Sequence, residues 1–96
     1  MTGTTAEVAL TGELDISTYA DARARLAAAE QSAPELLVVD LAGLRFVDST
    51  GVRLILSADQ RAREAGRRLA LRLGDGSARR VFTALGLVDR FDVLDG

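Results

Sequence analysis

The sequence predicts an α/β fold with a mostly parallel sheet and helices packed against it. Segments with the periodicity of strands alternate with segments with the periodicity of helices, which is the order typical of parallel sheets. Residues 36–41 form a continuous apolar run, LLVVDL, as expected for a strand that is covered on both faces. The chain has 96 residues, enough for one modest hydrophobic core, so we expect residues 1–96 to form a single domain.

A strand and a helix are predicted before this apolar run. Residues 7–10 alternate polar and apolar side chains, a pattern typical of a strand. Residues 20–31 are rich in Ala, Leu and Arg, which favour a helix. Either Ser17 or Thr18 is suited to cap that helix, and Thr18 has the spacing of a capping box with Asp21.

Two helices and two strands are predicted after the apolar run. Residues 52–65 have the period of an amphipathic helix, and Gly66 is expected to end it. Residues 69–73 alternate Leu with Arg or Ala, which predicts a strand with one face more exposed. Ser77 is expected to cap a short third helix, and residues 90–94 are expected to form a last strand.

The composition excludes several classes of function. The chain contains neither Cys nor His, which excludes disulfides, thiol catalysis, zinc–thiolate sites and Ser-His-Asp chemistry. All 12 basic residues are Arg, and 14 acidic residues outnumber them, so we do not expect direct nucleic-acid binding. No apolar run approaches the ~20 residues of a membrane span, and the first residues lack the pattern of a signal peptide. We therefore expect a cytoplasmic protein.

The strongest candidate site is Asp48-Ser49-Thr50-Gly51, directly after the apolar strand. Open α/β sheets gather functional residues at such strand-to-helix junctions. One interpretation is a helix cap, in which Asp48 or Ser49 accepts a backbone N–H bond. The other is that the Ser49 hydroxyl is exposed at the positive end of a helix, where it is suited to carry a phosphate. A nucleophilic role for Ser49 is disfavoured, because the chain has no His or Lys to act as its base.

Other polar motifs carry weaker signals. The GDGS stretch at residues 74–77 lacks the spacing and the Lys of a phosphate-binding loop, so a tight turn is favoured. Glu13 and Asp15 are candidate ligands for a hard cation together with Asp48, but no spaced ligand loop accompanies them. We predict neither a metal nor a cofactor. Asp59 and Arg63 have the spacing of an ion pair on one helix, whereas the other arginines nearby suggest a solvated face.

Three motifs resemble STAS domains, and within them the bacterial anti-anti-sigma factors, also called anti-sigma factor antagonists. They are TGELDISTY at residues 11–19, VVDLAGLRFVDSTGVRLIL at residues 38–56, and SARRVFTALGLVDRF at residues 77–91. The resemblance covers about residues 8–94. It implies one STAS-like domain over residues 1–96, shorter at both ends than many family members.

The resemblance implies a switch by partner exchange rather than an enzyme. In the family, the unphosphorylated protein binds an anti-sigma factor that is also a serine protein kinase, and the sigma factor is released. The kinase then uses ATP and magnesium to phosphorylate a serine of its partner, and a serine phosphatase reverses the reaction. By motif position, the phosphoacceptor in this chain is Ser49.

The resemblance also implies a partner-binding surface around that serine. Asp48, Thr50 and Gly51 flank the acceptor, and Asp15 matches an acidic residue of the family in the loop beside the site. Arg53 stands where many members have a second Gly, so we expect it to alter the docking surface.

Two other functions fit the sequence. A STAS module that is never phosphorylated would be a scaffold or accessory subunit of a signalling or lipid-transport assembly, with Ser49 serving only as a helix cap. A small nucleotide- or anion-binding domain would bind its ligand without any kinase. Detection of phosphoserine after incubation with ATP and the cognate kinase separates the partner switch from the scaffold.

Overall fold

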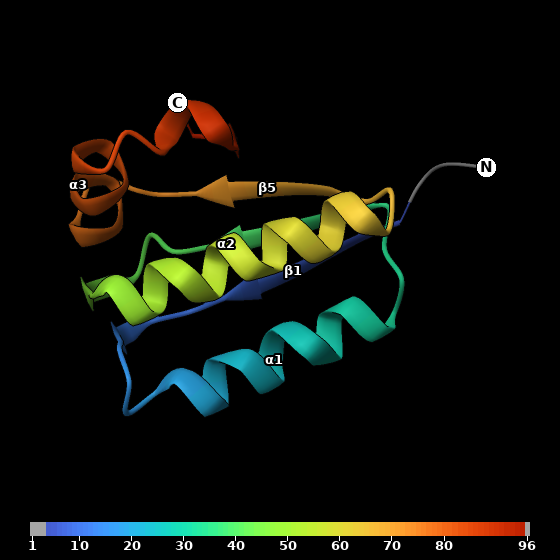
Figure 1. Ribbon diagram of the computed structural model, residues 1–96, viewed down its shortest axis with the longest axis horizontal. Helices are drawn as coiled ribbons and strands as arrows, with labels where there is room; N and C mark the ends of the chain where they lie inside the picture. The colour runs from blue at the N-terminus through green and yellow to red at the C-terminus, as the bar shows by residue number, and fades with distance from the viewer. Residues whose placement is uncertain (1–3, 96) are drawn as a thin grey trace.

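The computed structural model describes residues 4–95 and confirms the predicted α/β class. The elements follow in this order: β1 (Thr5–Ala9), β2 (Gly12–Leu14), α1 (Tyr19–Gln31), β3 (Leu36–Asp40), β4 (Leu44–Val47), α2 (Ser49–Glu64), β5 (Arg68–Arg72), α3 (Ser77–Ala84), the 3-10 helix η1 (Val88–Arg90) and β6 (Asp92–Val93). Figure 1 shows α2 lying along the sheet, with α1 beside it.

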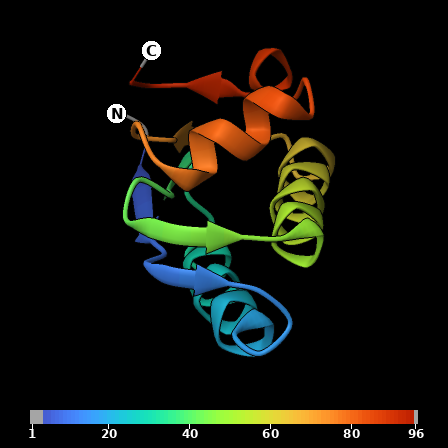
Figure 2. The ribbon, with the colours of Figure 1, turned by 90° about the vertical axis from the view of Figure 1, so that its left-hand side faces the viewer.

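The strands form two sheets in which every pairing is parallel. The larger sheet has the order β1-β3-β5-β6, and β2 and β4 make the smaller one. The chain runs from β1 into β2 and from β3 into β4, so the smaller sheet lies at the carboxyl ends of β1 and β3 (Figure 2). Leu10 N donates to Asp40 O and Gly12 N donates to Gly43 O, and these bonds keep the two segments adjacent where they pass from the larger sheet into the smaller one.

β2 and β4 are the two strands that the sequence did not predict. They are three and four residues long, too short for a periodic pattern to stand out. Gly12 has a φ of 80°, a conformation that glycine adopts without strain, and this allows the chain to turn from β1 into β2. Gly66, with a φ of 70°, ends α2 as predicted.

Helices α1 and α2 cover one face of the larger sheet (Figure 2). The core between these layers includes Leu26 of α1, Leu37 and Val39 of β3, and Ile55 of α2, all fully buried. Helix α3 packs against β4 at one end of the molecule and buries Phe82. Within residues 4–95, no helix is long and apolar enough to cross a membrane.

Charged side chains, rather than a helix, cover the other face of the larger sheet in the described residues. Residues 37–39 are buried, so the expected cover on both faces of this strand is found, but on this face it does not come from a helix. The strand register places four residues in one row across this face: Glu7, Val38, Ala70 and Asp92. Arg68 pairs with Asp92 at 2.9 Å and Arg72 lies 3.8 Å from Glu7. Val38 and Ala70 are nevertheless buried, because long side chains lie over small ones.

Ion pairs of Arg61 and Asp59 tie α2 to its neighbours, which corrects the expectation that the other arginines of this region form a merely solvated face. Arg61 donates to both carboxylate oxygens of Glu30 on α1, with an Nη2–Oε2 distance of 2.9 Å. The predicted pair of Asp59 and Arg63 is confirmed at 2.9 Å, and Asp59 also accepts from Arg90 at 3.3 Å. Arg90 belongs to η1, so the carboxylate of Asp59 links α2 to the segment before β6.

Two predicted side-chain caps are not formed, because both hydroxyl groups donate to backbone carbonyl groups of strands instead. The Thr18 side chain makes no cap hydrogen bond to α1. Its hydroxyl donates to Glu13 O at 2.9 Å and accepts from Asp15 N at 3.0 Å. Ser77 is the first residue of α3 rather than its cap, and its hydroxyl donates to Arg45 O at 2.6 Å.

Replacing Phe82 by Ala is expected to lower the free energy of unfolding by about 3–5 kcal/mol, because it leaves a cavity in the core. Phe82 is fully buried, and its ring meets Phe91 edge to face with the centroids 5.8 Å apart. Leu85→Ala at the end of α3 is the control, since Leu85 is 56 % exposed, and it should change stability by less than ~0.5 kcal/mol. Urea denaturation followed by circular dichroism measures both. Equal losses in the two variants would contradict this placement of the core.

Candidate functional site

The loops that follow β2 and β4 lie side by side at one end of the molecule (Figure 2). Leu14 pairs with Val47 where the two strands end, and Asp48 N donates to Leu14 O at 3.2 Å. Asp15 comes directly after Leu14, so the loop that it begins adjoins the start of α2. The parallel pairing of two short strands therefore brings together two acidic residues that are 33 positions apart in the sequence.

Asp48 is the cap of α2, and Ser49 is not. The backbone of Asp48 is extended, with a φ of −109° and a ψ of −173°, and its Oδ1 accepts from Gly51 N at 3.0 Å. Ser49 is the first residue of the helix and is exposed. Among residues 4–95, the Ser49 hydroxyl has no hydrogen-bond partner. Asp48 therefore forms the helix cap, and Ser49 has the exposed hydroxyl, so each interpretation of this junction describes a different residue.

The electrostatic setting of Ser49 favours a negative group. Ser49 lies at the N-terminus of a 16-residue helix, where the backbone N–H groups and the helix dipole give a partial positive charge. No acidic residue occupies the first turn of α2. A phosphate on this hydroxyl would meet the positive helix end that binds anions in many proteins. The chain has no His or Lys that could serve as a base for the Ser49 hydroxyl, which disfavours a nucleophilic role for it.

Gly51 allows the first turn of α2 to touch β2. A Cβ atom at this position would lie 2.8 Å from Leu14 Cγ, 2.8 Å from Val47 Cγ2 and 2.9 Å from Leu14 O. Two of these atoms belong to buried side chains and the third to the backbone, so none of them can move aside easily. The glycine is therefore required for the helix to begin directly against the ends of β2 and β4.

The loop after β2 is held in shape by the carboxylate of Asp15. This carboxylate accepts from Ser17 Oγ at 2.6 Å, from Ser17 N at 2.9 Å and from Thr18 N at 3.2 Å. The hydrogen bond from the Ser17 hydroxyl is the main reason that the pKa of Asp15 lies below its ordinary value, and the backbone donors lower it further. Asp15 therefore stays ionised beside the site at neutral pH.

Two exposed apolar side chains beside the site were missed from the sequence. Ile16 is 81 % exposed in the loop that Asp15 shapes, and Phe46 on β4 is 49 % exposed, two residues before Asp48. Exposed aromatic and aliphatic groups within a polar rim are common in surfaces that bind proteins. The sequence did carry a signal, because Ile16 is the one large apolar residue in the polar turn DIST.

The three carboxylates considered as cation ligands are each engaged elsewhere. Glu13 pairs with Arg45 at 3.1 Å, Asp15 binds its own loop, and Asp48 caps α2. Within the described part of the chain, no three acidic side chains gather as a metal site. The loops therefore use their acidic residues for structure and surface charge.

The remaining predicted residues lie on α2. Thr50 is half-buried in the first turn, next to Ser49. Arg53 is exposed one turn further on, in a shallow groove of about 450 Å³ that also includes Leu56 and Leu87. The fold thus brings Asp15 into one patch with Asp48, Ser49, Thr50 and Gly51, and it sets Arg53 at the border of that patch.

Comparison with protein families identifies the fold. A family model described as "Mlab, STAS domain" matches residues 1–94, so the chain belongs to the STAS domain family. A search of curated protein sequences finds no significant match.

Solved structures with the same fold include two anti-sigma factor antagonists. The antagonist from Mycobacterium paratuberculosis has a TM-score of 0.78 and 24 % identity, over 97 % of this chain and 79 % of that one. The antagonist SpoIIAA in its unphosphorylated form has a TM-score of 0.71 and 27 % identity, over 100 % of this chain and 84 % of that one. A sulfate transporter family protein from Wolinella succinogenes has a TM-score of 0.73 and 15 % identity, over 95 % of this chain and 79 % of that one.

Gly51→Ala is expected to lower the free energy of unfolding by about 1–3 kcal/mol, because the added methyl group overlaps Leu14 and Val47. The sign is informative, since Ala in an uncrowded helix position is more stable than Gly by about 1 kcal/mol. Ser57→Ala, at an exposed position of the same helix, is the control and should leave stability within ~0.5 kcal/mol. Chemical denaturation measures both variants. A stabilised Gly51→Ala protein would show that α2 does not begin against β2 as described.

Proposed function

We propose that this protein is an anti-sigma factor antagonist that works by partner exchange in the cytoplasm. In its unphosphorylated form it binds an anti-sigma factor that is also a serine protein kinase. Phosphorylation of Ser49 releases the kinase, and a serine phosphatase restores the binding form. The protein itself is a binding partner without enzymatic activity.

The exposed hydroxyl of Ser49 is the observation that carries this proposal. Because Asp48 caps α2, the hydroxyl of Ser49 is not needed to cap the helix. A kinase can reach an exposed hydroxyl on the first turn of a helix without unfolding the core. The helix N-terminus then stabilises the phosphate rather than repelling it, so both forms are expected to remain folded.

The similarity to solved antagonists supports the same reading. SpoIIAA, at 27 % identity, is described as an anti-sigma factor antagonist in its unphosphorylated form. The match covers 100 % of this chain and 84 % of SpoIIAA, so the similarity extends over the region of the Ser49 patch. We infer that an anti-sigma factor is the partner of this chain too.

The proposed partner surface consists of Asp15, Asp48, Ser49 and Thr50, with Arg53 at its border, and Gly51 is buried beneath it and positions the first turn of α2. Its apolar part is Ile16 and Phe46, which a docked partner would cover. A phosphate adds a charge of roughly −1.5 to −2, beside two carboxylates and close to apolar groups. Docking would then require the phosphate to lose its water next to like charges, which explains how phosphorylation opposes binding.

Incubation with ATP, Mg²⁺ and the kinase is expected to place one phosphate on Ser49. The kinase is purified from native cells on immobilised Ser49→Ala protein, which the proposal expects to retain it. Tandem mass spectrometry locates the phosphate. Ser57→Ala is the matched control, because Ser57 is another exposed serine of α2, and it should still be phosphorylated on Ser49. Phosphate on Thr50 alone, or phosphate persisting in Ser49→Ala, would contradict the assignment.

Ser49→Asp is expected to fold normally but to bind the kinase at least about tenfold more weakly than wild type, a difference of ~1.4 kcal/mol. Ser49→Ala should bind like wild type and melt within about 1 kcal/mol of it, because the cap at Asp48 is untouched. Calorimetric titration gives the affinities, and thermal melting establishes that both variants are folded. Strong binding by a folded Ser49→Asp protein would rule out release by negative charge at this position.

Arg53→Gly is expected to weaken binding of the partner and to speed removal of the phosphate from Ser49. Arg53 lies four residues after Ser49 on the helix, a spacing at which its guanidinium can reach a phosphate. Arg23→Gly on α1 is the control, since it also costs an exposed helix position about 1 kcal/mol but belongs to a different helix from Ser49. Affinity and phosphatase rate are measured side by side. Values unchanged from wild type in both assays would leave Arg53 with no part in the surface.

The second candidate function is a STAS module that is never phosphorylated and serves as a scaffold or accessory subunit. The description of the matching family model names Mlab rather than an antagonist, and a sulfate transporter family protein shares the fold. The phosphorylation experiment decides between the two functions. A partner that binds wild type and Ser49→Asp equally, and that transfers no phosphate, is the result expected of a scaffold.

A further inference from the structure

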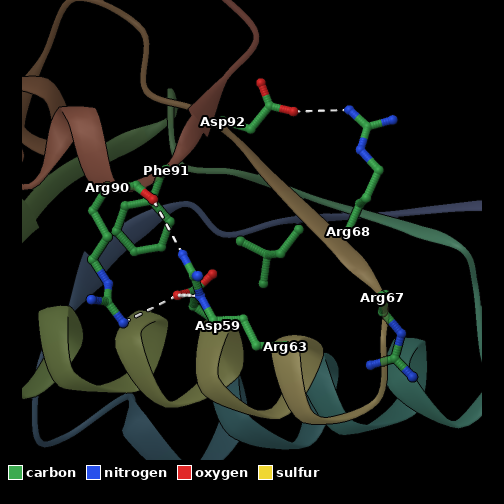
Figure 3. Close-up of a pocket in the computed structure, with 8 residues that line it drawn as sticks. Asp59, Arg63, Arg67, Arg68, Arg90, Phe91 and Asp92 are labelled. Atoms are coloured by element: carbon green, nitrogen blue, oxygen red, sulfur yellow. Dashed lines mark hydrogen bonds and ion pairs between the residues drawn. The ribbon is translucent and has the colours of Figure 1, made fainter.

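A pocket rich in arginine lies away from the Ser49 patch. We call it the arginine pocket, with a volume of about 290 Å³ and these lining residues: Asp59, Arg63, Arg67, Arg68, Leu69, Arg90, Phe91 and Asp92. Figure 3 shows Arg63 and Arg90 gathered at Asp59 on one side of the pocket, and Arg68 directed toward Asp92 on the other.

The arginine pocket is formed where α2 ends and β5 begins. β6 pairs only with Ala70 and Leu71, so the first two residues of β5 extend past it and leave a concave edge. Asp59 is ten residues after Ser49 on the same helix, a distance of about 15 Å along the helix axis. The pocket is therefore not a place where a phosphate carried by Ser49 could bind.

The lining of the pocket has an excess of positive charge. Four guanidinium groups face two carboxylates, and both carboxylates are already paired. Asp59 is 5 % exposed and accepts from Arg63 and Arg90, so one buried negative charge is shared by two positive charges. Arg67 donates only to the neutral carbonyl oxygen of Pro34.

The guanidinium groups also have unused donors. Each guanidinium carries about five N–H groups in a planar fork that matches the oxygens of a phosphate. Within residues 4–95, none of the four arginines uses more than two of its side-chain nitrogens in hydrogen bonds. Ion pairing inside the protein therefore leaves donors available to an anion from solution.

The shape of the pocket favours a compact anion over a nucleotide base. Its apolar part, Leu69 and Phe91, is buried, with 8 % and 7 % of each residue exposed. Neither side chain offers an open face on which a base could stack. What the pocket presents to solvent is charge, from side chains on α2, β5, η1 and β6 and on the turn between α2 and β5.

We propose that the arginine pocket binds a compact phosphate group, either as inorganic phosphate or as the phosphate of a small monoester. Arg63 and Arg68, on opposite sides of the pocket, supply the recognition, while Arg90 neutralises Asp59. This site is independent of Ser49 and of partner exchange.

Titration of the ¹⁵N-labelled protein with inorganic phosphate, at constant ionic strength maintained with chloride, tests the proposal. Amide signals of residues 63, 67–69 and 90–92 should shift in a saturable way, and the melting temperature should rise with phosphate. Arg68→Gln should weaken binding about three- to tenfold. Arg45→Gln is the matched control and should bind like wild type, because each arginine forms one exposed ion pair and their side chains are 70 % and 78 % exposed.

Two further measurements test the role of Arg63 and whether the phosphate group alone is recognised. Arg63→Gln should weaken binding to a similar degree as Arg68→Gln, and its melting curve without phosphate shows that it is folded. Adenosine monophosphate should shift the same pocket residues with an affinity within about threefold of inorganic phosphate, if the phosphate group alone is recognised. Shifts that never saturate, equal effects of Arg68→Gln and Arg45→Gln, or binding of the monophosphate alone would each overturn the proposal.

Discussion

The contact between the first turn of α2 and the end of β2 is the constraint on which the site depends. Because Gly51 has no side chain, the helix can begin against Leu14, with its backbone close to the carbonyl oxygen of that residue. Asp48 then joins the two elements, since its backbone N–H donates to Leu14 O and its carboxylate accepts from Gly51 N. With the cap made by Asp48, the hydroxyl of Ser49 is left at the surface. The geometry that makes the serine available is therefore the same geometry that closes the core.

Ion pairs between arginines and acidic residues supplement the contacts of a small hydrophobic core. Arg61 holds α1 against α2 by donating from Nε and Nη2 to the two carboxylate oxygens of Glu30, and the carboxylate of Asp59 holds η1. On the open face of the sheet, paired charges cover Val38 and Ala70, which a helix would otherwise have to cover. A guanidinium can bind several acceptors at once and remain partly hydrated, so such a surface is both structural and suited to bind anions. The arginine pocket arises from this second property.

The two ends of α2 are surrounded by side chains of opposite charge. At the N-terminus, a positive helix end lies beneath an exposed serine, between carboxylates that are held by their own hydrogen bonds. Near the C-terminus, arginines outnumber the carboxylates that they surround. The role proposed for the first end rests in part on similarity to solved antagonists, whereas the role proposed for the second end is argued only from the side chains of this chain.

The sequence by itself determined the α/β class, the main helices and strands, and the start of a helix at residues 48–51, but not β4, the strand that leads into that helix. These features depend on local periodicity and on residue types near a helix start, and both can be read directly from the amino-acid sequence. Tertiary structure alone decided that Asp48 rather than Ser49 is the cap, since both are good capping residues and only the position of β2 separates them. It also decided that one face of the sheet is covered by charged side chains, and that residues between 59 and 92 share one pocket. Each of these outcomes depends on contacts between segments that are distant in the chain, and periodicity contains no information about such contacts.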